Sequence, residues 1–341
     1  MRRHPICNHL SLAAIICVLA LALSGTASAG ASSEAMENGY YYTVQKGDTL
    51  WDLSRRFADS PWVWPQLWTE NADAIANPHL IYPGQKIRLT RKKGAPATAA
   101  TWQDEPLTQN VHFHYSLVDR VGFIRKEPVP PTAVIFDARE RSRELLAEGD
   151  IVYLKPEGAA ALAPGQLFTV YRTLDPINDK TTHAYIGIQH LLLGVVKVLQ
   201  SEADHAVGEI VRSYRRYMKI SDKLMPFVPR STEISYKPSP AGIEGTIFEV
   251  EEPVSVFGQF HTVFIDRGRV HGIREGQVYS VYRRDEKMAG PKGAEKKISV
   301  PVDLGDLVVM HVEENNSTVM VTDSKVEFYT GVRIRSPLQA R

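Results

Sequence analysis

Hydrophobic and polar positions change their period along this chain. Within residues 40–91, the run at 41–44 alternates, and Leu50, Leu53 and Phe57 then follow at steps of three and four. Alternation is typical of a strand with one buried face, whereas steps of three and four place side chains on one face of an α-helix. The pattern therefore predicts a strand followed by a helix.

The same region carries signals for the ends of its elements. Thr49 can cap the helix through its hydroxyl, and Asp52 three residues later answers it in a capping box. Pro65 has no amide hydrogen and suits the first turn of a second helix. The stretch "NPHLIYPGQ" is typical of turns, and "KIRLT" after it is typical of a strand. The predicted order is strand, helix, helix, strand.

From about residue 111 the pattern becomes that of short strands. Runs such as "TAVIFDA", "GDIVYL" and "GVVKVLQ" are β-branched or alternating, and Gly, Pro and Asp separate them. The run "PGQLFTVYR" at 164–172 returns as "EGQVYSVYR" at 275–283, a shift of 111 residues, and the matches continue to Ser213 and Ser324. We therefore expect two copies of one all-β module, each a small barrel or sandwich.

The fold class expected from these patterns is multidomain α+β. The lysine-rich stretch "RRDEKMAGPKGAEKKIS" in the second copy is expected to be a solvated hairpin tip. The expected parts are a signal peptide (1–29), a strand-helix-helix-strand domain (40–91), a linker (92–110), β module 1 (111–225), a Pro-rich linker (226–240) and β module 2 (241–337).

The first residues have the layout of a secretory signal peptide. Two arginines precede an apolar run at 10–23, and "ASA" closes it at 27–29. The run is too short to span a bilayer comfortably, so we expect cleavage after Ala29, no integral membrane span afterwards, and a location in the periplasm or cell envelope. Cys7 and Cys17 both lie in this segment, so the remaining chain has neither a disulfide nor a thiol nucleophile.

Charge argues against nucleic acid as a partner. The formal net charge is +1, and removal of Arg2 and Arg3 with the signal segment takes it to −1. A nucleic-acid-binding chain usually carries a basic excess. We therefore expect neither nucleic acid nor an anionic membrane as a partner.

Two blocks of the first domain resemble a known family. "YTVQKGDTLWDLSRRF" and then "NPHLIYPGQKIRL" look like a LysM domain, and the whole chain resembles secreted proteobacterial proteins with one such N-terminal domain and a long β-rich tail. The resemblance implies a two-stranded sheet with two helices on one side. It also implies binding of N-acetylglucosamine-containing glycans, which are peptidoglycan in bacteria and chitin elsewhere.

The resemblance also implies where the glycan binds. The groove of the family lies between the "GDTL" loop and the "NPHLIY" loop, and His79 is a further candidate beside the contacts carried over. A shallow, uncharged groove suits an acetamido sugar, which offers an amide, hydroxyls and a methyl group. The expected glycan contacts are Gly47, Asp48, Thr49, Leu50, Asn77, Pro78, Leu80, Ile81 and Tyr82.

The stretch "SPWVWPQLW" at 60–68 holds three of the five tryptophans. Trp64 and Trp68 share a helical spacing, and a domain this small needs large aromatic side chains in its core. We therefore expect these two in the core. Trp62 precedes the helix and Trp51 lies off its apolar face, so both are candidates for stacking on a ligand at the surface.

Enzyme signatures are weak. A cysteine peptidase or an L,D-transpeptidase needs a thiol. "HFH" at 112–114 has the His-x-His form of some zinc endopeptidases, with both rings on one side of a strand, but no His-x-x-x-Asp completes a site. These histidines are therefore expected to lie on an exposed strand. We expect no catalytic residue, no metal and no cofactor.

The most favoured function is thus a non-catalytic, peptidoglycan-binding protein of the cell envelope. In this interpretation the β modules act as a spacer or as an arm that binds an envelope protein. Two alternatives stay open. One is a cell-wall hydrolase, or a hydrolase activator, with an unrecognised site in the tail. The other is an envelope assembly or scaffold protein whose modules pair with another protein through strand edges.

Overall fold

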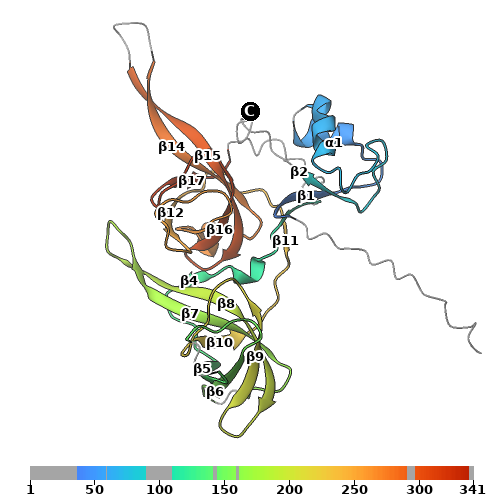
Figure 1. Cartoon of the computed structure of the whole chain (residues 1–341). Helices are drawn as coiled ribbons and strands as arrows, with labels where there is room; N and C mark the ends of the chain where they lie inside the picture. The colour runs from blue at the N-terminus through green and yellow to red at the C-terminus, as the bar shows by residue number, and fades with distance from the viewer. Residues whose placement is uncertain are drawn as a thin grey trace, which may run out of the picture. The chain divides into compact units, whose positions relative to one another are not determined.

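The structure is a computed structural model (Figure 1). It describes residues 37–58, 60–89, 110–140, 144–158, 161–289 and 296–337. The expected signal peptide, the cleavage point after Ala29 and nearly all of the expected linker at 92–110 lie outside these ranges. Among the described residues, no helix combines the length and the hydropathy needed to cross a membrane.

The first domain has the predicted order of elements, with one short 3-10 helix added. Its elements are β1 (Gly39–Thr43), α1 (Leu50–Phe57), η1 (Pro61–Val63), α2 (Trp64–Thr69) and β2 (Lys86–Leu89). The predicted N-cap is confirmed, because the Thr49 hydroxyl accepts the Asp52 amide at 3.1 Å. The Asp52 carboxylate answers the Thr49 hydroxyl at 2.7 Å and not the Thr49 backbone amide of a full capping box. Pro65 lies in the first turn of α2.

The core of this domain follows the predicted helical face. Leu50 and Leu53 are buried in one cluster with Tyr42 of β1 and Ile87 of β2, and Phe57 packs against that cluster. The two tryptophans predicted for the core, Trp64 and Trp68, are partly buried and pack on the same cluster. The indole N–H of Trp68 donates to the Ile75 carbonyl at 2.8 Å, so its polar atom is satisfied.

Two further strands extend the β1–β2 pair. They are β3 (Val111–His114) and β11 (Glu233–Ser235), and the antiparallel sheet has the order β11-β3-β1-β2. These two segments lie in the parts of the chain predicted to be β module 1 (111–225) and the Pro-rich linker (226–240). The pairing has a physical reason: β2 satisfies one edge of β1, and β3 satisfies the backbone groups of the other.

In the described residues of the first β region there are seven strands and one 3-10 helix, η3 (Val118–Arg120). The strands form one sheet of order β4-β8-β7-β10-β5-β6-β9, and β8 also pairs with β9. Strand β9 pairs with β6 on one side and with β8 on the other, which closes a ring of six strands. Strand β4 pairs with β8 outside this ring. The strands are β4 (Phe123–Arg125), β5 (Ala133–Ala138), β6 (Ile151–Pro156), β7 (Leu167–Asn178), β8 (Tyr185–Ser201), β9 (Ala206–Ser213) and β10 (Lys223–Pro226).

The second β region is a closed barrel of order β12-β13-β16-β15-β14-β17. In Figure 1, β14 and β15 continue beyond the barrel as a two-stranded arm. The β-rich character predicted for the tail is confirmed. The elements are β12 (Glu244–Val250), β13 (Thr262–Ile265), η4 (Arg269–His271), β14 (Val278–Ala289), β15 (Lys296–Val312), β16 (Ser317–Ser324) and β17 (Arg333–Arg335).

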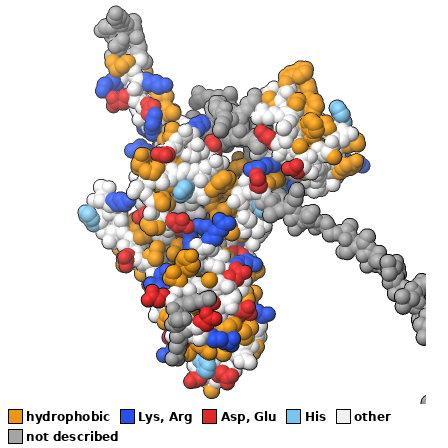
Figure 2. Space-filling model, in the orientation of Figure 1, with side chains coloured by type: hydrophobic (Ala, Val, Ile, Leu, Met, Phe, Trp, Pro, Cys, Tyr) orange, Lys and Arg blue, Asp and Glu red, His pale blue; other side chains and the backbone are white. Residues whose placement is uncertain are grey.

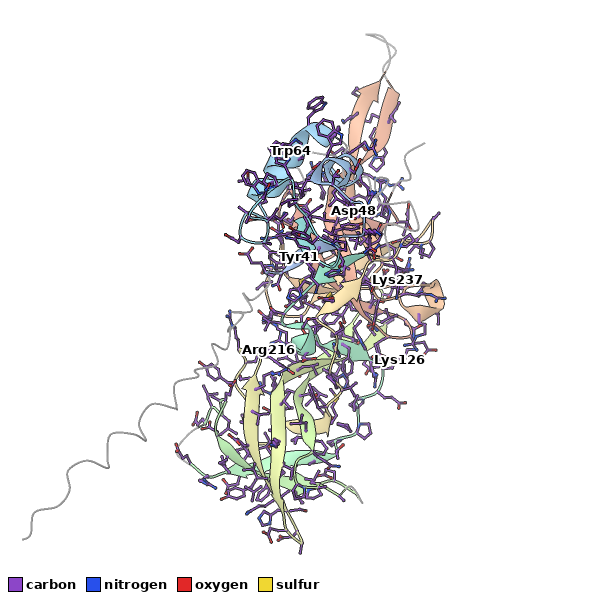
Figure 3. The ribbon with its side chains drawn as sticks, turned by 90° about the vertical axis from the view of Figure 1, so that its right-hand side faces the viewer. Tyr41, Asp48, Trp64, Lys126, Arg216 and Lys237 are labelled. Carbon is purple, nitrogen blue, oxygen red and sulfur yellow. The ribbon has the colours of Figure 1, made fainter. Side chains whose placement is uncertain are left out.

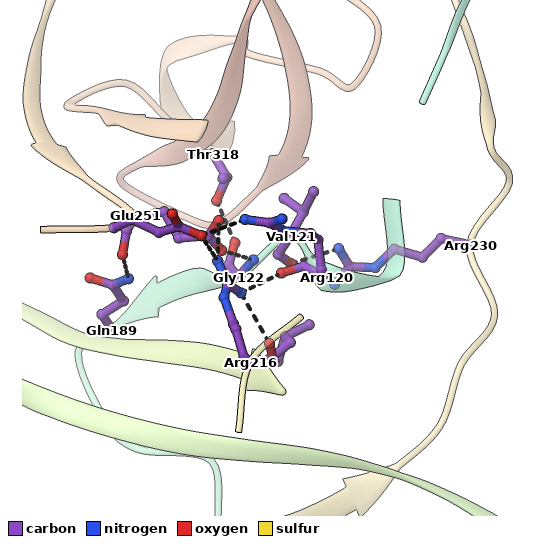
Figure 4. Close-up of polar contacts among 10 residues, drawn as sticks. Arg120, Val121, Gly122, Gln189, Arg216, Arg230, Glu251 and Thr318 are labelled. Atoms are coloured by element: carbon purple, nitrogen blue, oxygen red, sulfur yellow. Dashed lines mark hydrogen bonds and ion pairs between the residues drawn. The ribbon is translucent and has the colours of Figure 1, made fainter. Parts of the chain in front are cut away.

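A buried carboxylate links the two β regions (Figure 4). The side chain of Glu251 accepts the Gly122 amide at 2.6 Å and the Arg216 guanidinium at 3.0 Å. Its backbone carbonyl accepts the Gln189 side chain at 2.8 Å, and Thr318 donates to the Gly122 carbonyl at 2.8 Å. Because Glu251 is almost fully buried, these partners are what makes its charge tolerable there.

Candidate functional site

A hollow of about 320 Å³ opens between the loop that precedes α1 and the loop that precedes β2. This volume lies at the lower end of the roughly 300–1,000 Å³ that small-molecule sites occupy. Figure 3 marks two of its lining residues, Asp48 and Trp64. The lining consists of Asp48, Thr49, Leu50, Trp51, Trp64, Pro78, His79 and Ile81.

Asp48 shapes the first loop. Its Oδ2 accepts the Tyr42 hydroxyl at 2.8 Å and the Gln45 amide at 2.7 Å, and its Oδ1 lies 3.6 Å from Arg56. Burial, and then the hydrogen bond to Asp48, raises the pKa of Tyr42 to about 12. Gly47 precedes it with a φ of +95°, a conformation that glycine adopts without strain. The carboxylate of Asp48 is thus engaged by the domain itself.

Thr49 and Leu50 continue this loop into the helix. The Thr49 hydroxyl is used by the cap of α1, which fixes the direction in which the loop enters the helix. Leu50 is 3 % exposed and forms an apolar floor under the hollow. Both residues therefore hold fixed positions before any ligand arrives.

The second loop is a set of turns. The Asn77 side chain accepts the His79 amide at 3.0 Å, and the Asn77 carbonyl accepts the Leu80 amide at 3.0 Å. Pro78 and Ile81 line the hollow from this loop. Asn77 therefore acts as a turn residue, as Gly47 does in the first loop.

Four of the predicted contact residues are not in the lining. Gly47 and Asn77 form the loops, while Leu80 and Tyr82 are 53 % and 63 % exposed beside the hollow. The other five predicted residues do line it. They are Asp48, Thr49, Leu50, Pro78 and Ile81.

Three lining residues were left out of the predicted contact set. Trp64 packs on the core with one part and lines the hollow with another, and its ring centroid is 6.2 Å from that of His79. Helical spacing indicated only the core side of Trp64. His79 and Trp51 did carry a signal, because His79 lies within the second loop and Trp51 directly follows Leu50.

The site offers little charge to a ligand. Of the lining residues only Asp48 and His79 can ionise, and the carboxylate of Asp48 already has partners. A charged ligand group would lose its hydration without gaining a free counter-charge. An uncharged ligand with hydroxyl and amide groups, and with one apolar side, suits this lining better.

The two histidines of "HFH" lie on β3. Both rings are 6.1 Å from the ring of Tyr41, so the prediction that they share one side of a strand is confirmed. The prediction that they are exposed is wrong for His112, which is 7 % exposed because β11 and β1 enclose β3. Burial lowers the pKa of His112 to about 4. Within the described ranges, no group of three or more His, Cys, Asp or Glu side chains is arranged to hold a metal ion.

Comparison with known proteins agrees with this geometry. Residues 42–90 match the family model of the LysM domain. Over 57 residues the chain is 42 % identical to the "Uncharacterized protein YqbP" of Bacillus subtilis (strain 168). That match covers 14 % of this chain and 26 % of the relative, so the chain spans about a quarter of the relative's length.

The chain therefore contains a LysM domain at its first sheet and helices. LysM domains bind N-acetylglucosamine-containing glycans such as peptidoglycan and chitin. The hollow between the two loops lies within the matched residues, and its partly apolar lining, whose one carboxylate is engaged by the domain itself, fits such a sugar. The domain thus indicates glycan binding.

Proposed function

We propose that this protein is a non-catalytic, peptidoglycan-binding protein of the cell envelope. The single observation that carries the proposal is the hollow between the two loops of the LysM domain. One N-acetylglucosamine unit occupies it, with its acetamido methyl group against Leu50 and Ile81 and its polar groups toward backbone of the loops. The β regions act as a spacer, or as an arm for an envelope protein.

The contact set in this proposal has two parts. The residues that touch sugar are those that line the hollow, including Trp64 and His79. Gly47 and Asn77 act by shaping the loops, and Leu80 and Tyr82 contact a glycan strand where it leaves the hollow. A single shallow site gains little net binding free energy, because ordering the sugar and the side chains around it costs entropy. We therefore expect a dissociation constant on the order of micromolar to millimolar. Repeated sugars in the wall polymer add avidity.

The lining of the hollow supports the proposal that this hollow binds sugar without cleaving it. Glycosidases use a pair of carboxylic side chains about 5–10 Å apart. The lining described above has one carboxylate, that of Asp48, and it is held by Tyr42 and the Gln45 amide. A group with such partners is poorly placed to act as an acid, a base or a nucleophile.

For the tail we propose that the two β regions are copies of one six-stranded barrel. The positions of the longest strands support this. The first and last residues of β14, β15 and β16 lie 111 positions after those of β7, β8 and β9. The register of the first hairpin shifts at Val170/Tyr171, and that of the second shifts at Val281/Tyr282, which is 111 further on. Two rigid barrels in series suit a spacer.

A location in the envelope follows from the same proposal. The ligand is a wall polymer, so the protein has to reach the compartment that holds it. Residues 1–29 supply the export signal in this account, with cleavage after Ala29 and release into the periplasm.

Purified sacculi test the proposal directly. The protein should sediment with sacculi and release no soluble muropeptides. Changing Pro78→Glu or His79→Glu places a bulky charge in the hollow, and we expect either change to abolish sedimentation. Ala72→Glu is the matched control, because Ala72 is exposed on the same domain outside the lining.

Each result has a definite meaning. If both hollow variants sediment like the wild type while remaining folded by circular dichroism, the hollow is not the glycan site. If wild-type protein liberates muropeptides above the level of heat-inactivated protein, the non-catalytic assignment is wrong.

A further inference from the structure

An exposed pair of tryptophans adjoins the hollow. Trp62 in η1 is 76 % exposed, and Trp51 in the first turn of α1 is 39 % exposed. Their ring centroids are 4.8 Å apart with an interplanar angle of 77°, an edge-to-face contact. Trp51 also lines the hollow. Figure 2 shows hydrophobic side chains gathered over the helical part of this domain.

The exposure of Trp62 is unusual, because it leaves apolar surface in water and so costs free energy. Fully exposed indole leaves a large apolar surface in water, and aromatic side chains bury roughly 150–250 Å² when packed. Trp64 and Trp68, only a few residues away, do pack on the core. The same nine residues thus contain two tryptophans that complete the core and one that does not.

The contact with Trp51 gives Trp62 a defined orientation. An edge-to-face pair restricts the rotation of both side chains, and a side chain that is already ordered loses less entropy when it binds. Trp62 keeps an open ring surface in this arrangement, since most of its area remains exposed. It is therefore a preorganised apolar platform at the surface.

The size of the hollow leaves a use for that platform. At about 320 Å³ the hollow holds a short part of a polymer. A longer glycan strand has to continue over the neighbouring surface. Trp51 forms part of the lining and touches Trp62, so the platform is continuous with the hollow.

We propose that Trp62, positioned by Trp51, is a second sugar subsite that stacks on a pyranose ring of the same glycan strand. The inference rests on the proposed binding of N-acetylglucosamine units in the hollow. A pyranose ring presents C–H groups on its faces and hydroxyls around its rim, so a ring face matches an indole face. The subsite makes the protein select long glycan strands over short ones.

Binding as a function of glycan length tests this subsite. We would titrate the full protein with chitin oligomers of two to six sugars by isothermal titration calorimetry. In the wild type, affinity should rise as the oligomer becomes long enough to reach Trp62. Trp62→Ala should bind the shortest oligomer as the wild type does and the longest about three- to tenfold more weakly, which corresponds to the loss of one aromatic contact.

Two further variants complete the design. Trp62→Phe keeps an aromatic face and should retain part of the gain with length. Tyr217→Ala removes a residue that is 64 % exposed in the first β region, and it should leave binding at every length unchanged. Trp51 and Trp64 line the hollow, so every bound oligomer should alter the tryptophan fluorescence. Long oligomers should add a further change that Trp62→Phe lacks.

The outcomes separate this inference from the proposed function. If Trp62→Ala and wild type gain equally with length, the second subsite is refuted and the hollow stands. If Trp62→Ala weakens every length equally, Trp62 belongs to the hollow and the length selection is refuted. If the wild type binds no oligomer and no sacculi, the proposed function itself fails.

Discussion

His190 of β8 is buried as a neutral ring, and this makes the stability of the first β region depend on pH. Its Nε2 accepts the Val129 amide at 2.9 Å, and its Nδ1 lies 3.1 Å from the Ile188 carbonyl oxygen. A second proton would turn Nε2 into a donor that faces another donor. Burial lowers the pKa of His190 to about 4, the hydrogen bond to Ile188 opposes this, and Arg125 adds to it.

The magnitude follows from the shift. The ordinary pKa is 6.5 and that in the folded protein is about 4, so the unfolded chain binds the proton more readily. The contribution to stability is complete above pH 6.5 and is lost as the pH falls towards 4. At about 1.4 kcal/mol per pKa unit the total is roughly 3 kcal/mol. Between pH 7 and pH 5 we expect a loss of about 2 kcal/mol.

Urea unfolding at pH 7 and pH 5 measures this loss. His190→Gln should be less stable than wild type at pH 7, because the Val129 amide loses the ring nitrogen that accepts its hydrogen bond. Its stability should fall by about 2 kcal/mol less than that of wild type between the two pH values. His183→Asn is the control, since His183 is exposed in a turn and asparagine tolerates its φ of 57°.

The direct check is the titration of the His190 ring by NMR in the full protein. A ring that titrates near pH 6.5 would refute the reasoning. So would a His190→Gln variant whose pH dependence superimposes on that of wild type. Because unfolding of a chain with several domains need not be two-state, the ring titration takes precedence over the urea curves.

Two further predictions concern the tail. Glu251→Ala should remove one of the two carboxylates that pair with the Arg216 guanidinium, since Glu252 also lies 3.0 Å from it, and should leave the Gly122 amide without its acceptor. We expect a destabilisation of about 1–3 kcal/mol, seen as a lower melting temperature. An unchanged melting temperature in Glu251→Ala would contradict the reasoning. Gly194→Ala and Gly305→Ala should each abolish soluble expression, because a Cβ would lie 2.1 Å and 2.2 Å from backbone oxygens of the neighbouring strand. Gly258→Ala, where the nearest atom is a side-chain oxygen at 3.3 Å, should express normally, and equal expression of all three variants would disprove the claim.

The first domain was predictable because its elements are set by interactions between residues close in the sequence. The capping hydroxyl of Thr49, the apolar steps to Leu53 and Phe57, and Pro65 in a first turn each depend on residues within one or two turns of the chain. The split of the tryptophans between core and surface followed from the same spacing. Such features are readable because their partners lie close in sequence.

Strand partners were not predictable in the same way. Alternation shows which face of a strand is buried, but the neighbour of that strand is chosen by the whole fold. The sequence at 112–114 therefore indicated a strand, and 233–235 was assigned to the Pro-rich linker, but neither pattern indicated that these segments continue the sheet of the LysM domain. The buried state of His112 depends on that pairing, so it was mispredicted for the same reason.

The candidate site was predictable in part. The two loops were located by the resemblance to the LysM family, and the hollow lies between them. The resemblance carried contacts over by position, so it could not separate residues that line the hollow from residues that form the loops. Trp64 was missed as a lining residue because its helical spacing indicated only its contact with the core. The same side chain packs on the core with one part and lines the hollow with another.

The sheet order β11-β3-β1-β2 has a consequence for the timing of assembly. Glu233 joins a sheet whose β1 strand begins about 190 residues earlier. At a synthesis rate of ~5–20 residues per second, roughly 10 to 40 s separate the emergence of the two segments. Strand β3 emerges about 120 residues before β11, so its outer edge has no partner strand for roughly 6 to 24 s of that interval. A nascent or prematurely terminated chain therefore presents an unpaired strand edge that can pair with another chain until residue 235 emerges.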